Sequence, residues 1–136
     1  MLTSVLHTVQ MGQSGIKCVQ NSAIRPELKQ QLKLQLQQYD RMETQAKKLA
    51  KCKNWEIKDI HPGVLKMADI MTKAKLFGGE RDSKIAGMLI QGNTRGMITG
   101  MKNLRQSSKA DPQVRALAEK LVEQEKCSIR ASEKYL

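Results

Sequence analysis

The side chains best suited to covalent chemistry in this chain of 136 residues are three cysteines, Cys18, Cys52 and Cys127. A cysteine acts as a nucleophile when a neighbouring cation or base stabilises its thiolate. Cys52 fits best because Lys51 and Lys53 flank it, whereas Cys18 and Cys127 lie beside apolar positions and are expected to be small buried side chains. The odd number of cysteines and the lack of a C-x-x-C pair favour free thiols in a reducing compartment. No Ser-His-Asp arrangement emerges from the spacing, so we identify no catalytic residue.

A cluster of lysines is the second feature that could bind a partner, and it consists of Lys47, Lys48, Lys51 and Lys53. One interpretation is that these cations stabilise the C-terminal end of a helix. The other is a patch for an anion or a nucleic acid, since the net charge of +11 would supply phosphate affinity that falls with salt. The basic residues are nevertheless spread over several segments with acids between them, and only 3% of the residues are aromatic and able to stack on bases. Nucleic acid is therefore the alternative partner and not the favoured one.

The cysteines and lysines described above are expected to lie on helices, because apolar residues along the chain recur at alternating spacings of four and three. The scarcity of aromatic residues requires an aliphatic core, which suits helices better than sheets. This apolar periodicity covers the segments 3–23, 28–51, 64–77, 83–106 and 112–135. The expected helix starts are Thr3 or Ser4, Pro26 with Glu27, Asp82 or Ser83, and Asp111 with Pro112.

The pattern predicts an all-α protein, a single domain over residues 1–136, folded as an up-down-up-down four-helix bundle. The long connection at 52–63 is interpreted as a surface crossover or as an extra short helix. Gly78 and Gly79 should break the third helix or separate it from a short helix that precedes it. The pattern leaves open whether 63–77 and 83–106 form one kinked helix or two.

A stripe of glycines marks the segment 83–106, where Gly92, Gly96 and Gly100 recur at every fourth residue. Each glycine costs about 1 kcal/mol of helix propensity relative to alanine. We expect the bare face to form a helix-packing groove, in which close approach of a neighbouring backbone or bulky side chain offsets that cost. The remainder of the helix is apolar over more than half its circumference, which is typical of a central helix or of one at a subunit contact. The sequence therefore predicts self-association, as a homodimer.

Four stretches of the chain, considered together, resemble a known family. They are the run S-K-I-A-G-M-L-I-Q-G-N-T-R-G-M-I at 83–98, M-G-Q-S-G-I at 11–16, Q-Q-Y-D at 37–40 and the closing Y-L at 135–136. In these stretches the chain is similar to a set of small, functionally uncharacterised proteins from low-GC Gram-positive bacteria. The resemblance spans nearly the whole chain and implies a ferritin-like four-helix bundle. Because its motifs are packing motifs, it implies a fold and no activity.

A ferritin-like fold implies a di-iron site, which needs a Glu from each of two helices and Glu-x-x-His from each of the other two. The first helix cannot contribute, because the first acidic residue of the chain is Glu27. Asp40 and Glu43 have a suitable spacing on the second helix, but no histidine accompanies them. The two histidines, His7 and His61, fall near a chain end and in a loop. We therefore expect no metal and no other cofactor, and a degenerate metal-binding protein is the third functional alternative.

The sequence favours a non-enzymatic structural or interaction protein of the cytoplasm. No apolar run approaches the ~20 residues that span a bilayer, and the beginning of the chain lacks the basic region of a secretion signal. Polar side chains nevertheless occupy predicted interior positions at Gln35, Tyr39, Gln124 and Glu125. A polar pocket at these positions would support ligand binding, and dry, close packing would exclude it.

Overall fold

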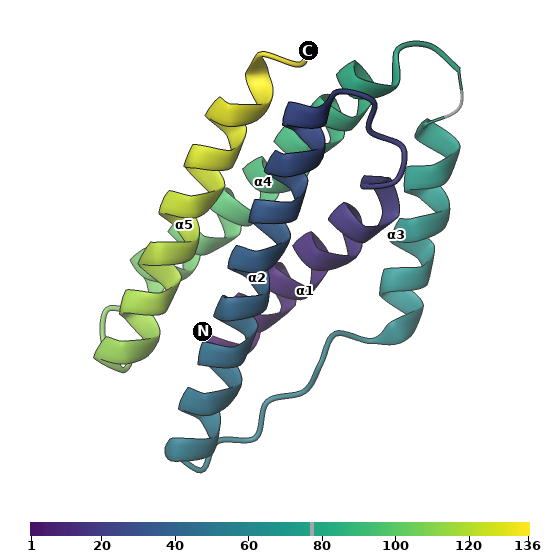
Figure 1. Ribbon diagram of the computed structural model, residues 1–136. Helices are drawn as coiled ribbons and strands as arrows, with labels where there is room; N and C mark the ends of the chain where they lie inside the picture. The colour runs from purple at the N-terminus through teal and green to yellow at the C-terminus, as the bar shows by residue number, and fades with distance from the viewer. Residues whose placement is uncertain (77) are drawn as a thin grey trace.

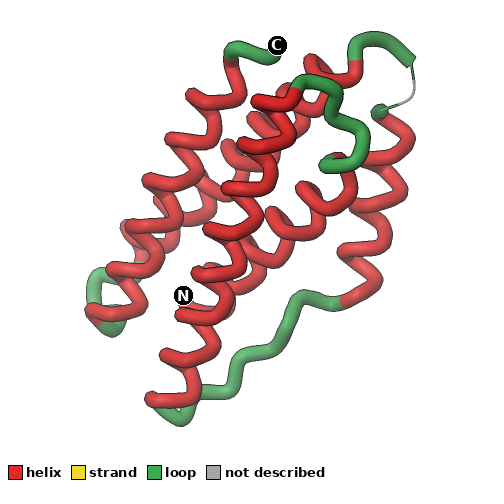
Figure 2. Tube along the Cα trace, in the orientation of Figure 1, coloured by secondary structure: helices red, strands yellow, loops and turns green. Residues whose placement is uncertain are grey.

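The computed structural model describes residues 1–76 and 78–136, and all of the regular structure in these residues is helical (Figure 2). The helices are α1 (Leu2–Val19), α2 (Pro26–Cys52), α3 (Pro62–Lys75), α4 (Arg81–Gln106) and α5 (Pro112–Glu133). The all-α prediction is confirmed. Phe77, which was expected to close the apolar face of 64–77, lies outside the described residues. In the described part of the chain, no helix combines the length and apolar character that a bilayer crossing requires.

The four longer helices lie side by side, and the 14-residue α3 packs against α1 (Figure 1). Contacts near the helix ends fix their directions. The start of α4 contacts the start of α2, because Asp82 accepts hydrogen bonds from the backbone N–H groups of Ile24 and Arg25 at 2.7 and 2.9 Å. At the opposite end, Lys53 after α2 pairs with Asp111 before α5 at 3.1 Å. Helices α2 and α4 therefore run in one direction, and α1 and α5 run in the other.

The predicted up-down-up-down order is therefore wrong, because α2 and α4 are parallel. The connection after α2 and the helix α3 carry the chain back along the length of the longer helices before α4 begins (Figure 1). Of the two interpretations of the third segment, the separate short helix is the one observed. Gly78 and Gly79 follow α3 with φ angles of 76° and 75°, a left-handed conformation that glycine adopts without a Cβ clash.

Two of the expected helix starts are confirmed, and two are wrong. Proline stands in the first turn of α2 as expected, and Asp111 caps α5 by accepting from the backbone N–H of Gln113 at 2.9 Å. Neither Thr3 nor Ser4 caps α1, because the helix already begins at Leu2. Neither Asp82 nor Ser83 caps α4, which begins after Glu80. The Asp82 carboxylate instead joins α4 to the turn between α1 and α2.

The interior between the longer helices is aliphatic, as the composition requires. Its largest fully buried apolar side chains are Leu6, Val9, Ile16, Leu28, Leu32, Met42, Ile85 and Leu121. Burying one such side chain contributes about 1.5–3 kcal/mol relative to leaving it exposed. Each of the four longer helices supplies members of this set, so the core holds these helices together. Helix α3 contributes nothing to it, since none of its residues, all of which are described, is buried.

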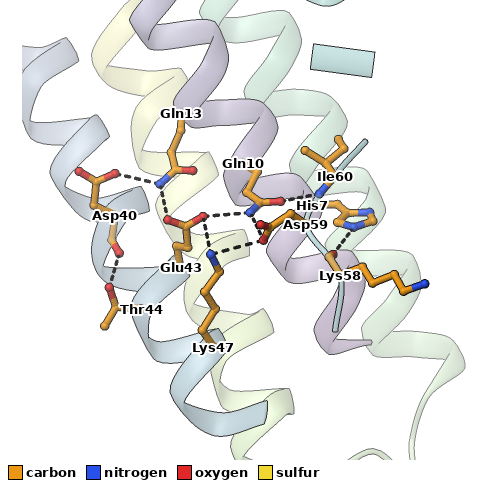
Figure 3. A network of polar contacts seen from close by, with 10 residues as sticks. All are labelled: His7, Gln10, Gln13, Asp40, Glu43, Thr44, Lys47, Lys58, Asp59 and Ile60. Carbon is orange, nitrogen blue, oxygen red and sulfur yellow. Dashed lines mark hydrogen bonds and ion pairs between the residues drawn. The ribbon is translucent and has the colours of Figure 1, made fainter. Parts of the chain in front are cut away.

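A polar network fixes the irregular segment that precedes α3 (Figure 3). The buried side chain of Gln10 on α1 donates from Nε2 to Glu43 at 3.0 Å and to Asp59 at 2.9 Å. Its Oε1 accepts from the backbone N–H of Ile60 at 2.8 Å. Lys47 bridges the two carboxylates, at 3.7 Å from Glu43 and 3.3 Å from Asp59. Because the amide of Gln10 both donates and accepts hydrogen bonds, it holds the connection between α2 and α3 (the crossover) in a defined path.

The glycine stripe of α4 packs closely over only part of its length. A Cβ atom on Gly100 would lie 2.6 Å from Cγ2 of Val122, and one on Gly96 would lie 3.0 Å from Cγ2 of Thr8. Gly92 behaves differently, because it is exposed and a Cβ atom there would have no neighbour within 4 Å. The prediction of one packing groove is therefore wrong at Gly92. The space beside this residue belongs to an open pocket and not to a neighbouring helix.

The close approach at Gly100 can be tested by adding a methyl group. In Gly100→Ala, the new Cβ would collide with the buried, β-branched Val122, and such overpacking should outweigh the gain in helix propensity, for a net loss of about 1 kcal/mol. Gly87→Ala on the same helix is the matched control, since no atom lies within 4 Å of its added Cβ. The free energy of unfolding of this control should rise by up to about 1 kcal/mol. Urea unfolding monitored by circular dichroism measures both, and equal stability of the two variants would contradict the packing argument.

Candidate functional site

A pocket of about 820 Å³ lies between α1, α3 and α4 and reaches inward to side chains of α2 and α5. This volume is in the range of small-molecule sites in proteins, about 300–1,000 Å³. The small residues that line it on α1 and α4 include Ser14, Gly15 and Gly92. Two of these, Gly15 and Gly92, have no atom within 4 Å of the position that a Cβ would take.

Apolar side chains supply most of the wall of the pocket. They come from three helices and comprise Ile16 and Val19 of α1, Met71 of α3, and Ile85, Met88 and Leu89 of α4. Of these, Ile16 and Ile85 are also core residues, at 2% and 0% exposed, so the pocket continues into the interior. A molecule in this space would bury apolar surface against side chains that are already held in place by the core.

A cluster of polar side chains from three helices forms the buried end of the pocket. Glu125 of α5 is 1% exposed and accepts a hydrogen bond at Oε1 from the hydroxyl of Tyr39 of α2, at 2.8 Å. Its Oε2 accepts a hydrogen bond from Nδ2 of Asn93 of α4, at 2.5 Å, and the same nitrogen lies 3.1 Å from the Tyr39 hydroxyl oxygen. All three residues line the pocket. We call this set the Glu125 cluster.

Burial dominates the electrostatics of the Glu125 cluster. It raises the pKa of the Glu125 carboxyl to about 7, although the hydrogen bonds from Asn93 and Tyr39 favour the ionised form. Burial, followed by the charge of Glu125, raises the pKa of Tyr39 well above its ordinary value. The hydroxyl of Tyr39 therefore stays protonated and donates a hydrogen bond to Glu125. Both hydrogen-bond partners of the carboxylate are neutral. When Glu125 ionises, its charge is therefore balanced by dipoles and not by a buried cation.

Amide groups of the pocket remain unpaired beside this cluster. Within residues 1–76 and 78–136, Nε2 and Oε1 of Gln35 and Oδ1 of Asn93 are buried and have no hydrogen-bond partner. Gln35 is 4% exposed and Asn93 is 5% exposed, and both line the pocket. An unpaired buried polar group costs about 1–3 kcal/mol. A molecule that hydrogen-bonds to these amides on binding would recover that energy.

Three of the four polar interior positions predicted from the sequence meet at this pocket. Gln35, Tyr39 and Glu125 all line the pocket, whereas Gln124 lies outside its lining. Sequence reasoning missed Asn93, which appeared only as a polar interruption of the glycine stripe. Its position three residues before Gly96 places it on the same helical face, and that spacing was the available signal.

One of the three cysteines, Cys18, lines the pocket. The Sγ atom of Cys18 donates to the Asp69 carboxylate at 2.7 Å, and burial together with this hydrogen bond raises the pKa of Cys18 to about 11. Cys18 is therefore held as a thiol, and it is partly buried as expected. Cys52 and Cys127 are exposed, so the expectation of a buried Cys127 is wrong because it lies on the outer face of α5.

The lysine cluster is partly neutralised. Lys47 pairs with Glu43 and Asp59 (Figure 3), and Lys53 pairs with Asp111. The Lys53 ammonium holds the pKa of the Asp111 carboxyl below its ordinary value. The other two members, Lys48 and Lys51, are exposed on α2. Because half of the cluster already has acidic partners, it is a weaker anion patch than the sequence indicates.

The histidines and acids of the described residues are not arranged as metal ligands. In this part of the chain, no group of three or more His, Cys, Asp or Glu side chains could hold a metal ion. His7 donates from Nε2 to the backbone carbonyl of Lys58 at 2.9 Å, and His61 accepts at Nδ1 from the backbone N–H of Gly63 at 2.9 Å. His7 therefore contacts the connection between α2 and α3 at Lys58, and His61 caps the start of α3.

No protein-family model, curated protein or solved structure matches this chain. The function is therefore argued from the pocket and the Glu125 cluster.

The raised pKa of Glu125 predicts a specific pH dependence of stability. The folded protein binds this proton more tightly than the unfolded chain, in which the pKa is near 4.5. The resulting stabilisation is complete below about pH 4.5 and is lost as the pH rises through about 7. Between pH 5 and pH 8, the free energy of unfolding should therefore fall by about 2–3 kcal/mol more in the unmodified protein than in Glu125→Gln. Urea unfolding of both proteins over this pH range measures the difference.

Glu123→Gln, at an exposed position of the same helix, provides the control for the loss of one negative charge. Its pH dependence should parallel that of the unmodified protein. If Glu125→Gln also parallels it, the carboxyl of Glu125 does not titrate as the buried geometry requires.

Proposed function

We propose that this protein is a non-enzymatic binding protein of the cytoplasm that holds an amphipathic small molecule in the pocket between α1, α3 and α4. The observation that carries this proposal is the pair of buried amides, Gln35 and Asn93, which line the pocket and have side-chain atoms without a hydrogen-bond partner in the protein. Native proteins rarely leave such groups unpaired without a functional reason. The exposed, free thiols of Cys52 and Cys127 are consistent with a reducing compartment.

The fold proposed for this binding protein is a ferritin-like four-helix bundle. Helices α1, α2, α4 and α5 form two antiparallel pairs, and the single long connection between the pairs contains α3. One long crossover is the feature that distinguishes ferritin-like bundles from those with short loops throughout. Such bundles build their sites from inward-facing side chains of several helices, and the Glu125 cluster occupies an equivalent interior position.

Recognition, and not catalysis, is the chemistry that the cluster supports. The hydrogen bonds from Tyr39 and Asn93 hold the carboxylate of Glu125 in one orientation, which suits the binding of a donor group. A nucleophilic cysteine needs a stabilised thiolate, whereas Cys18 is held as a thiol. The amides of Gln35 and Asn93 are neutral groups that can bind and orient a ligand.

A pocket-filling substitution tests the proposal. Gly92→Leu adds a side chain where no atom lies within 4 Å of the new Cβ, so it should occupy the pocket and, by its helix propensity, leave the fold at least as stable. The fluorescent apolar amine N-phenyl-1-naphthylamine is a suitable probe. We expect it to bind the unmodified protein at a ratio near one to one, and the variant at least about tenfold more weakly.

Gly87→Leu is the matched control, because it makes the same change on α4 at a position outside the pocket lining. It should bind the probe as the unmodified protein does. Gly15→Leu, on the opposite wall, should weaken binding as Gly92→Leu does. Probe binding that none of the three substitutions changes would refute a binding role for this pocket.

A second candidate role, self-association as a homodimer, is favoured by the outer surface of α3. None of the 14 residues of this fully described helix is buried. Its large apolar side chains are about half exposed, at 49% for Val64, 62% for Met67, 57% for Ile70 and 54% for Met71. The sequence placed the contact on α4, where Ile98 and Met101 are less exposed, at 44% and 39%. We place it on α3, with a second copy of α3 as the partner.

Sedimentation velocity over a range of protein concentrations tests the dimer. The charge of +11 on each copy opposes association, so the dimer should tighten as salt screens the repulsion. A Met67→Glu, Ile70→Glu double variant should be monomeric under conditions where the unmodified protein is dimeric. Leu34→Glu, a half-exposed apolar position on α2, should leave the dimer intact. A monomer at every concentration in high salt would rule out this role.

A further inference from the structure

We infer that the ligand of this pocket is a hydrophobic amine, an apolar molecule with a positively charged ammonium group that binds at the Glu125 cluster. The inference rests on the proposed binding function and adds the chemical class of the ligand. It follows from three properties of the pocket: its charge, its hydrogen-bonding groups and the side chains along its wall.

The charge at the buried end of the pocket favours a cation. Glu125 is the carboxylate that the pocket presents there, and its partners, Tyr39 and Asn93, are neutral. A carboxylate or phosphate ligand would place a like charge beside Glu125, where the low dielectric makes the repulsion strong. An ammonium group would instead supply the countercharge that the protein itself does not place on Glu125, and a buried charge needs such a partner.

The hydrogen-bonding groups favour the same head group. Two of the residues that line the pocket, Gln35 and Asn93, carry atoms without a partner in the protein: two acceptors, Oε1 of Gln35 and Oδ1 of Asn93, and one donor, Nε2 of Gln35. The oxygens of Glu125 can each accept a further hydrogen bond. Acceptors therefore outnumber donors, so the complementary ligand must be rich in donors. An ammonium group carries three donors and no acceptor.

The wall of the pocket requires an apolar body on the ligand. Ile16, Ile85, Met88 and Leu89 line the same pocket as the Glu125 cluster, and their side chains offer dispersion contacts but no hydrogen bonds. A small, fully hydrated cation would gain little from this wall. An alkyl or aryl chain would bury its surface there at about 25 cal/mol per Å².

Binding of such a cation is coupled to the protonation of Glu125. Because the cation stabilises the ionised carboxylate, binding near neutral pH should release a proton, and affinity should rise with pH. The other pocket-lining residues that carry titratable or charged groups are Met1 at its amino terminus, His7 and Cys18 of α1, Tyr39 of α2, Asp69 and Lys75 of α3, and Arg95 of α4. Lys75 and Arg95 are exposed to solvent, which screens their charges. Glu125→Gln therefore assigns any pH dependence to the buried carboxyl or to these other groups.

Three ligands with one chain and different head groups test the inference: octylamine, octanol and octanoate. Displacement of the naphthylamine probe, checked by isothermal titration calorimetry, gives their affinities at pH 6 and pH 8. At pH 8 we expect octylamine to bind at least about tenfold more tightly than octanol, and octanoate most weakly. In the unmodified protein the affinity for octylamine should be higher at pH 8 than at pH 6. Glu125→Gln should lose that pH dependence and about tenfold in octylamine affinity, so that octylamine no longer binds more tightly than octanol.

The outcomes separate this inference from the proposed function. If the three ligands bind equally, or octanoate binds best, and Gly92→Leu still weakens binding, the pocket binds ligands but the amine preference is wrong. If octylamine binds best but Glu125→Gln binds it unchanged, the role given to Glu125 is wrong. If neither the probe nor any octyl ligand binds, both the inference and the proposed function fail. The comparison of head groups uses the unmodified protein, so it remains decisive if Glu125→Gln does not fold.

Discussion

A carboxyl group buried without a cationic partner is the constraint on which the rest of this structure depends. Glu125 can occupy the interior only because Tyr39 and Asn93 donate hydrogen bonds to it from two other helices. These bonds fix the relative positions of α2, α4 and α5. The cluster also explains why glycine occupies two positions next to it. A Cβ on Gly96 would lie 3.2 Å from the Glu125 carboxyl carbon, and one on Gly12 would lie 2.5 Å from the Tyr39 ring. The glycines on these faces are therefore a consequence of the polar cluster.

The same sequence pattern has opposite structural effects within a few residues of α4. At Gly100 the absent side chain lets Val122 approach the backbone, whereas at Gly92 it leaves open space. The difference arises from the residues of neighbouring helices that face each glycine. Near Gly100 the neighbour is Val122 of α5, whose side chain fills the space, while Gly92 lines the same pocket as Ser14 and Gly15 of α1. A glycine therefore leaves open space only where no bulky side chain of another helix reaches it, as Tyr39 reaches Gly12 and Val122 reaches Gly100.

The sequence was sufficient to locate the helices but not to orient them or to find the pocket. Apolar periodicity is a local property, and it predicted helices in the segments that became α1 to α5. The direction of α4 depends on the length and anchoring of the crossover. That anchoring is set by the contacts of Gln10 with Asp59 and Ile60, which are about 50 residues away in the chain. The spacing of Asn93 from Gly96 indicates which face of the helix Asn93 occupies, but its role depends on contacts with residues of α2 and α5.

The arrangement of α3 determines how the interior exchanges with solvent. This helix lines one side of the pocket, yet none of its residues, all of them described, belongs to the buried core. Its detachment would therefore cost far less free energy than unfolding of the chain, and its backbone amides should exchange with deuterium through local opening events. Opening of this small, peripheral unit would widen access to the pocket without disturbing the core. Mutations that strengthen the core would then raise the melting temperature and leave the rate of this local opening unchanged.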